Sequence, residues 1–212
     1  MNSETARRFR EIRALVPESV TLIAVSKTHP FEQIKTLYDL GHRDFGENYV
    51  QELLSKAEAA RELGMTDIRW HMIGHLQSNK VKLILPIAFC IHTVDSIKLA
   101  QEIQKRAVQP VSILLEVNID HEETKSGFMP EEVNGAAKEI SQLPNISLKG
   151  LMCIPQPSHH GDSFHRLKEL EKSLHPLTQG ALSMGMSDDF KSAIQSGSTH
   201  VRIGSAIFGT RL

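Results

Sequence analysis

Short apolar runs rich in β-branched residues recur along the chain, and each is followed by a longer stretch with apolar residues at helical spacing. This alternation predicts repeated strand–helix units with parallel strands. We predict eight strands, at Val20–Ser26, Asp44–Gly46, Ile68–Ile73, Phe89–Val94, Val111–Asn118, Leu148–Ile154, Ala181–Met184 and His200–Ile203. Helical patterns lie between them, at Phe31–Leu40, Tyr49–Leu63, Ile97–Ala107, Pro130–Leu143 and His165–Leu174.

The length of the chain narrows the architecture. After a leading helix, 212 residues leave about 25 for each of eight units, which is too few for an inserted domain. We therefore expect a single α/β domain over residues 1–212, a (β/α)8 TIM barrel with an extra N-terminal helix. The competitor is an open doubly wound sheet, which usually has a Gly-rich turn after its first strand. Here that turn reads Ser26-Lys27-Thr28-His29-Pro30.

Charge and cysteine content exclude several classes of partner. The chain has 24 Lys plus Arg against 25 Asp plus Glu, so it lacks the basic footprint expected of a protein that binds nucleic acid or an anionic membrane. Cys90 and Cys153 lie in apolar runs and form no C-x-x-C pair, as expected for buried thiols in a reducing cytosol.

No run approaches the roughly 18 apolar residues of a spanning helix. We expect a cytoplasmic protein. An Arg-rich start resembles a mitochondrial presequence, but Glu4 and Glu11 argue against one.

Polar residues follow the predicted strands, where the reactive groups of such barrels lie. Lys27 comes directly after the first apolar run. Partial burial disfavours a charged ammonium, and a neutral amine is the form that condenses with an aldehyde. The alternative is a lysine that marks the end of a strand and reaches water.

The ends of the last two strands carry Ser183–Asp189 and Arg202–Gly209, which are rich in serine and glycine. Glycine lets the backbone approach an anion, and serine hydroxyls with exposed N–H groups can hold a phosphate. The alternative is ordinary turn and helix-capping chemistry. Arg202 lies inside the last predicted strand, where a permanent cation needs a partner. The partner is either an acidic side chain in a salt bridge, or a ring nitrogen or carboxylate of a ligand.

No other motif indicates a known chemistry. His71 and His75 are four residues apart, but on a strand and the loop after it, so we expect no metal site. Lys80 and Lys125 are loop lysines that could also meet an aldehyde, although a surface charge is the simpler interpretation. The sequence has no G-x-S-x-G elbow and no Walker loop.

Five segments, in register from near the N-terminus to the last strand, resemble the pyridoxal phosphate homeostasis protein family, whose fold is an alanine-racemase-like barrel. They are Leu22–Lys27, Phe45–Glu52, Trp70–Lys80, Leu182–Asp189 and Val201–Gly209.

The resemblance implies that pyridoxal 5′-phosphate (PLP) forms a Schiff base with Lys27. It also implies that Ser183, the Met184 backbone, Gly204 and Ser205 hold the phosphate. Arg202 would face the pyridine nitrogen, and Asn48 would lie beside the ring.

Arg202 constrains the chemistry of such a site. Strong carbanion stabilisation relies on a protonated ring nitrogen, and an arginine there keeps that nitrogen unprotonated. Alanine racemases compensate with a tyrosine base from a second domain, whereas Tyr38 and Tyr49, the only tyrosines here, are expected on outer helices. We therefore expect no catalytic residues.

The resemblance implies a PLP carrier that maintains vitamin B6 homeostasis and supplies apo-enzymes. We expect a monomer. The alternatives are a PLP-dependent racemase or decarboxylase, with water, His75 or a loop residue as its base, and a class I aldolase that uses Lys27 without a cofactor.

Overall fold

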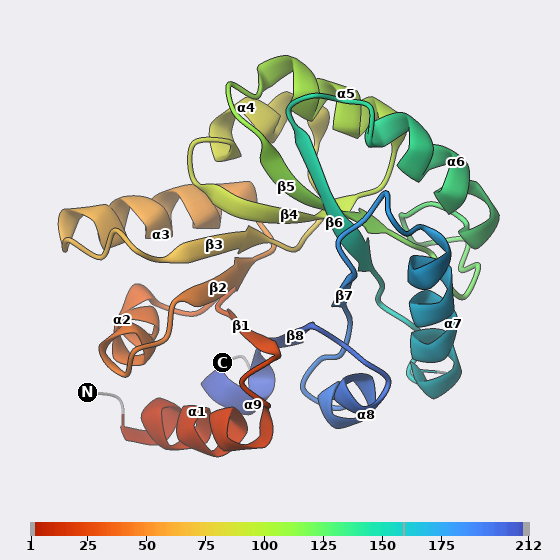
Figure 1. The fold of residues 1–212 in the computed structure, drawn as a ribbon. Helices are drawn as coiled ribbons and strands as arrows, with labels where there is room; N and C mark the ends of the chain where they lie inside the picture. The colour runs from red at the N-terminus through yellow and green to blue at the C-terminus, as the bar shows by residue number, and fades with distance from the viewer. Residues whose placement is uncertain (1–2, 159, 210–212) are drawn as a thin grey trace.

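The computed structural model describes residues 3–158 and 160–209, which form a closed barrel of eight parallel strands surrounded by helices (Figure 1). Neighbours in the chain are neighbours in the barrel, and β8 closes it against β1. The strands are β1 Thr21–Val25, β2 Asp44–Glu47, β3 Arg69–Met72, β4 Ala88–Val94, β5 Val111–Glu116, β6 Ile146–Met152, β7 Ala181–Ser183 and β8 His200–Ile203. The structure confirms the predicted TIM barrel.

The helices form the outer layer (Figure 1). They are α1 Ser3–Leu15, α2 Phe31–Asp39, α3 Val50–Glu62, α4 Val81–Ile84, α5 Ile97–Arg106, α6 Pro130–Ile140, α7 His160–Ser173, α8 Phe190–Gln195 and α9 Ser205–Phe208, with a 3-10 turn at Ser78–Lys80. The extra N-terminal helix is α1, which packs against α2 and α9. None of the described helices is both long and apolar enough to cross a membrane.

Apolar side chains that point outward from the strands pack under the helices and form the main hydrophobic core. The strands are buried by this layer on one face and by the barrel interior on the other, which explains why they read as nearly continuous apolar runs. A small second cluster, Cys90, Leu114 and Met152, lies apart from it.

The interior of the barrel is tightly packed beside β2. A Cβ added at Gly46 would lie 2.8 Å from Cγ2 of Ile23 and 2.9 Å from Cδ1 of Ile73. Glycine at position 46 therefore lets β2 approach its neighbours on both sides.

Candidate cofactor site

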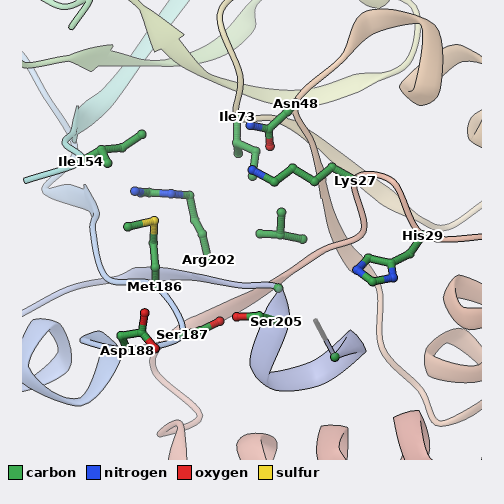
Figure 2. A pocket seen from close by; sticks show the side chains of 13 residues that line it. Lys27, His29, Asn48, Ile73, Ile154, Met186, Ser187, Asp188, Arg202 and Ser205 are labelled. Atoms are coloured by element: carbon green, nitrogen blue, oxygen red, sulfur yellow. The ribbon is translucent and has the colours of Figure 1, made fainter. Parts of the chain in front are cut away.

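A cavity of about 510 Å³ opens at the end of the barrel where the strands finish (Figure 2). This volume suits a small ligand. Its lining comes from the ends of β1, β2, β3, β6 and β8 and from the loop after β7. It comprises Val25, Lys27, His29, Asn48, Ile73, Ile154, Met186, Ser187, Asp188, Arg202, Gly204, Ser205 and Gly209.

Lys27 and Arg202 both extend into this cavity, from the turn after β1 and from β8 (Figure 2). The two strands are paired, with Ile23 opposite Arg202 in register. Lys27 lies near Asn48 and Ile73 in this view, and the two serines, Ser187 and Ser205, lie along another side. The cavity thus combines an amine, a guanidinium and a serine-lined wall.

Arg202 is held rigidly because it is only 4% exposed. Its guanidinium donates one hydrogen bond to Oγ of Ser183, at 2.7 Å, and one to the Cys153 carbonyl, at 2.9 Å. Burial lowers the pKa of Arg202 from its ordinary value. The guanidinium still has further N–H groups that can meet a ligand in the cavity.

A buried ion-pair cluster fixes the turn that carries Lys27. Nζ of Lys56 donates to the Ser26 carbonyl at 2.7 Å, to Oε1 of Glu47 at 2.8 Å and to Oε2 of Glu52 at 2.9 Å. Glu52 also accepts the backbone N–H of Thr28, at 2.7 Å. Thr28 has a φ of 64°, a conformation that side chains other than glycine rarely adopt. The residues on both sides of Lys27 are therefore clamped by the same cluster.

Asn48 follows β2 at the cavity wall, and its Oδ1 is buried without a hydrogen-bond partner in the structure. Its backbone lies against Gly74, where an added Cβ would come within 2.2 Å of the Asn48 carbonyl oxygen. A buried acceptor with no partner is costly, so this oxygen can take a donor from a ligand or a water molecule.

The serine-lined wall comes from the loop after β7 and the start of α9. Oγ of Ser187 accepts the backbone N–H of Ala206, at 3.2 Å. This contact brings Ser187, Gly204 and Ser205 to the same side of the cavity. Hydroxyls and backbone beside glycine are groups that can hold an anion without a lysine.

The structure brings Lys27, Asn48, Arg202, Gly204 and Ser205 to the cavity, but Ser183 and Met184 do not line it. Ser183 is fully buried inside the barrel beneath Arg202, and Met184 lies in the hydrophobic core. The backbone N–H of Met184 donates to the His200 carbonyl, at 3.1 Å. Met186, Ser187 and Asp188 reach the cavity in their place.

A smaller hollow of about 250 Å³ adjoins the cavity and shares Ile154 with it. It contains Glu116, at the end of β5, and His75, whose Nδ1 lies 3.2 Å from Oδ2 of Asp95. Burial, with the nearby Asp95 carboxylate, raises the pKa of Glu116 to about 7. This places a group able to exchange protons near neutral pH beside the cavity.

The raised pKa of Glu116 should make the stability of the folded protein depend on pH. Because the folded pKa lies above the unfolded value, the stability linked to this group is greatest below about pH 4.5 and falls as pH rises through 7. Glu116→Gln, which carries no charge, should therefore unfold at a higher temperature than the natural protein at pH 8 and lose this advantage at pH 5. Thermal unfolding at both pH values measures the effect. An equal difference at both would contradict the assigned pKa.

Sequence reasoning missed a pair of histidines inside the barrel. Nδ1 of His71 lies 2.9 Å from Nε2 of His92, which comes from the next strand. The only signal is alternation along each strand, which gives His71 and His92 inward positions but does not pair them. His71, Cys90 and His92 are also near enough to share a metal ion, with ligand atoms within 4.8 Å. The absence of a metal site stays a prediction.

Comparison with known proteins first gives the class. A family model described as the alanine racemase N-terminal domain matches residues 3–212. Pyridoxal phosphate homeostasis proteins from Pseudomonas aeruginosa and Escherichia coli K12 are each 42% identical to this chain. The alignments cover 99% and 92% of this chain and 94% and 87% of those proteins. The chain therefore belongs to the pyridoxal phosphate homeostasis protein family, within the alanine racemase N-terminal domain class.

A solved structure supports the same assignment. PipY from Synechococcus elongatus, solved with PLP bound, is 33% identical to this chain and superimposes with a TM-score of 0.88. The match covers 97% of this chain and all of that one.

Proposed function

We propose that residues 1–212 form one domain that binds PLP in the cavity and acts as a PLP carrier with little or no catalysis of its own. The observation that carries the proposal is the meeting of Lys27 and Arg202 in one cavity beside a serine-lined wall. The PLP-bound structure of PipY supports it.

The side chains of the cavity suit the chemical groups of PLP. This ligand supplies an aldehyde that condenses with an amine, a ring nitrogen that accepts a hydrogen bond, and a phosphate. Lys27 supplies the amine, and Arg202 donates to the ring nitrogen. Asn48 presents its buried Oδ1 beside the ring. Gly204 and Ser205 hold the phosphate, and Ser187 joins them.

Two residues predicted to hold the phosphate, Ser183 and Met184, lie outside the cavity lining. Ser183 accepts a hydrogen bond from Arg202, so we assign it to holding the guanidinium. Met184 contributes core packing and a backbone hydrogen bond to β8.

The positions of the tyrosines support a carrier over a racemase. The Tyr38 hydroxyl donates to Oδ1 of Asp67, at 2.5 Å, in the outer layer. Tyr49 is 58% exposed at the start of α3. Neither lines the main cavity, so neither is placed to act as a base on a ligand held there.

Glu116 favours one alternative function. A PLP-dependent racemase or decarboxylase needs a group that takes or gives a proton, and Glu116 and His75 lie in the hollow beside the cavity. A panel of amino acids incubated with the PLP-loaded protein separates the two functions. Turnover that is lost in Glu116→Gln supports the enzyme, and no turnover supports the carrier.

The test of PLP binding is the visible absorption spectrum of the purified protein, before and after borohydride, with peptide mapping of the reduced product. We expect a yellow protein whose label maps to Lys27. A colourless protein that also fails to bind added PLP would overturn the proposal and leave the class I aldolase to be tested.

We propose that this carrier supplies PLP to apo-enzymes. It would act in the cytoplasm and as a monomer. The test of this supply is the recovery of activity when the PLP-loaded protein is mixed with an apo-enzyme. Sedimentation of the purified protein tests the monomer. Recovery no faster than with free PLP at the same concentration would argue for storage without direct delivery.

A further inference from the structure

A line of hydrogen bonds crosses the inside of the barrel beneath the cavity. Oδ1 of Asp44 lies 3.1 Å from Nε2 of His71, and Nδ1 of His71 lies 2.9 Å from Nε2 of His92. Nδ1 of His92 lies 2.9 Å from Oγ of Ser183, which accepts from Arg202 at 2.7 Å. The line thus joins side chains from β2, β3, β4, β7 and β8.

All five side chains are buried, so each polar atom on the line depends on its neighbour in place of water. The Arg202 guanidinium carries a full charge, yet both hydrogen bonds described for it go to neutral oxygens. The line leads from this cation to the carboxylate of Asp44, which also forms a two-point contact with Arg69.

The chemistry at the two ends fixes the two outermost hydrogen bonds: Arg202 donates to Ser183, and Asp44 accepts from His71. A guanidinium only donates, and an ionised carboxylate only accepts. Burial alone would raise the pKa of Asp44, but hydrogen bonds from Arg69 and His71 hold it well below its usual range. If each ring carries one proton, His71 accepts at Nδ1 from Nε2 of His92, and His92 accepts at Nδ1 from the Ser183 hydroxyl.

The same logic places the proton on each imidazole. With one proton on each ring, His92 donates from Nε2 to Nδ1 of His71, and His71 donates from Nε2 to Asp44. Burial holds the pKa of His92 well below its ordinary value. A second proton on His71 would reverse the two central bonds and place another cation in the dry interior beside Arg69 and Arg202.

We propose that Ser183, His92 and His71 are positioning residues for Arg202, which they connect to the Asp44 carboxylate through hydrogen bonds that all point the same way. A hydroxyl that donates its own proton becomes a better acceptor, so the line strengthens the bond from Arg202 to Ser183. The guanidinium is thereby fixed where it meets the ring of the ligand. This inference rests on the proposed function.

Imidazole nitrogen NMR of the ligand-free protein tests the direction of the line without any cofactor. At pH 7 we expect His71 and His92 each to carry one proton, on Nε2, with Nδ1 unprotonated. A proton on Nδ1 of either ring, or two protons on His71, would overturn the assignment.

His92→Phe tests the positioning role, because it keeps an aromatic ring and removes both nitrogens. We expect the affinity for PLP to fall about tenfold, equivalent to about 1.4 kcal/mol, and the visible spectrum of the bound ligand to shift. The matched control is His200→Phe. The ring of His200 lies 5.9 Å from that of His92, but it contacts Thr199 and is outside the line.

Asp44→Asn separates charge from geometry, since the amide oxygen still accepts from His71 while the negative charge is lost. We expect an intermediate loss of PLP affinity, and this variant keeps the proposal testable if His92→Phe does not fold. Natural affinity and spectrum in both variants would overturn the positioning role. Failure of the natural protein to bind PLP would instead overturn the proposed function, and the NMR result would be unaffected.

Discussion

Lys27→Ala should abolish covalent capture of PLP, so that borohydride no longer fixes any label to the protein. The reason is that Nζ of Lys27 is the amine placed in the cavity with Arg202 and the serine-lined wall. Weak reversible binding should remain, because the groups assigned to the phosphate and ring are unchanged. Absorption spectra and peptide mapping after reduction measure both effects.

The matched control for this experiment is Lys125→Ala. Lys125 lies in the smaller hollow, where its Nζ donates to the Ile154 carbonyl at 3.1 Å. This variant should be labelled like the natural protein. A full label on Lys80 or Lys125 in Lys27→Ala would show that the reactive amine is elsewhere.

Lys56→Met should strongly destabilise the folded protein, because it leaves the carboxylate of Glu47 buried without its cation. Glu47 is fully buried and Lys56 is 10% exposed, so water cannot replace the missing partner. Removing one member of a buried pair costs about 3–5 kcal/mol. In a chain of this size that lowers the unfolding temperature by about 10 °C.

The pH dependence identifies the cause of this loss. Burial already raises the pKa of Glu47 in the natural protein, and loss of Lys56 raises it further. When the folded pKa of a carboxyl is raised, its contribution to stability is fully present below the unfolded pKa and is lost as pH rises. The difference in stability between the variant and the natural protein should therefore be small near pH 4.5 and grow above it. The double variant Lys56→Met/Glu47→Leu should recover much of the loss. A loss of stability that is the same at every pH would instead indicate that lost packing is the cause.

Alternation along the chain was sufficient to predict the strands, including the short β2 at Asp44–Glu47. It failed where local signals were weak or misleading. The 3-10 turn and α4 together span only Ser78–Ile84, too few residues to show helical periodicity. The helical pattern at His165–Leu174 begins five residues after the start of α7 at His160, because the prolines and the glycine near that start interrupt the pattern.

The rim of the barrel was predictable because strand ends identify it. Lys27, Asn48, Arg202, Gly204 and Ser205 all follow or end a strand, and all line the cavity. After β7 the backbone bends at Gly185, which has a φ of 95°. The residues beyond this bend therefore line the cavity, and Ser183 and Met184 do not.

The hydrogen-bonded line inside the barrel could not be predicted from local pattern. Its four bonds join residues 19, 21, 27 and 91 positions apart. Alternation indicates which side chains face inward, but which of them meet depends on the closure and stagger of the whole barrel.

The shape of the cavity also depends on Gly46. Ile73, which forms part of the cavity wall, is in close contact with the site where a Cβ of residue 46 would lie. A larger residue at 46 would require Ile73 to shift. One part of the cavity wall thus depends on a residue that does not itself line the cavity, so a substitution at 46 could reshape the site while every contact residue stays the same.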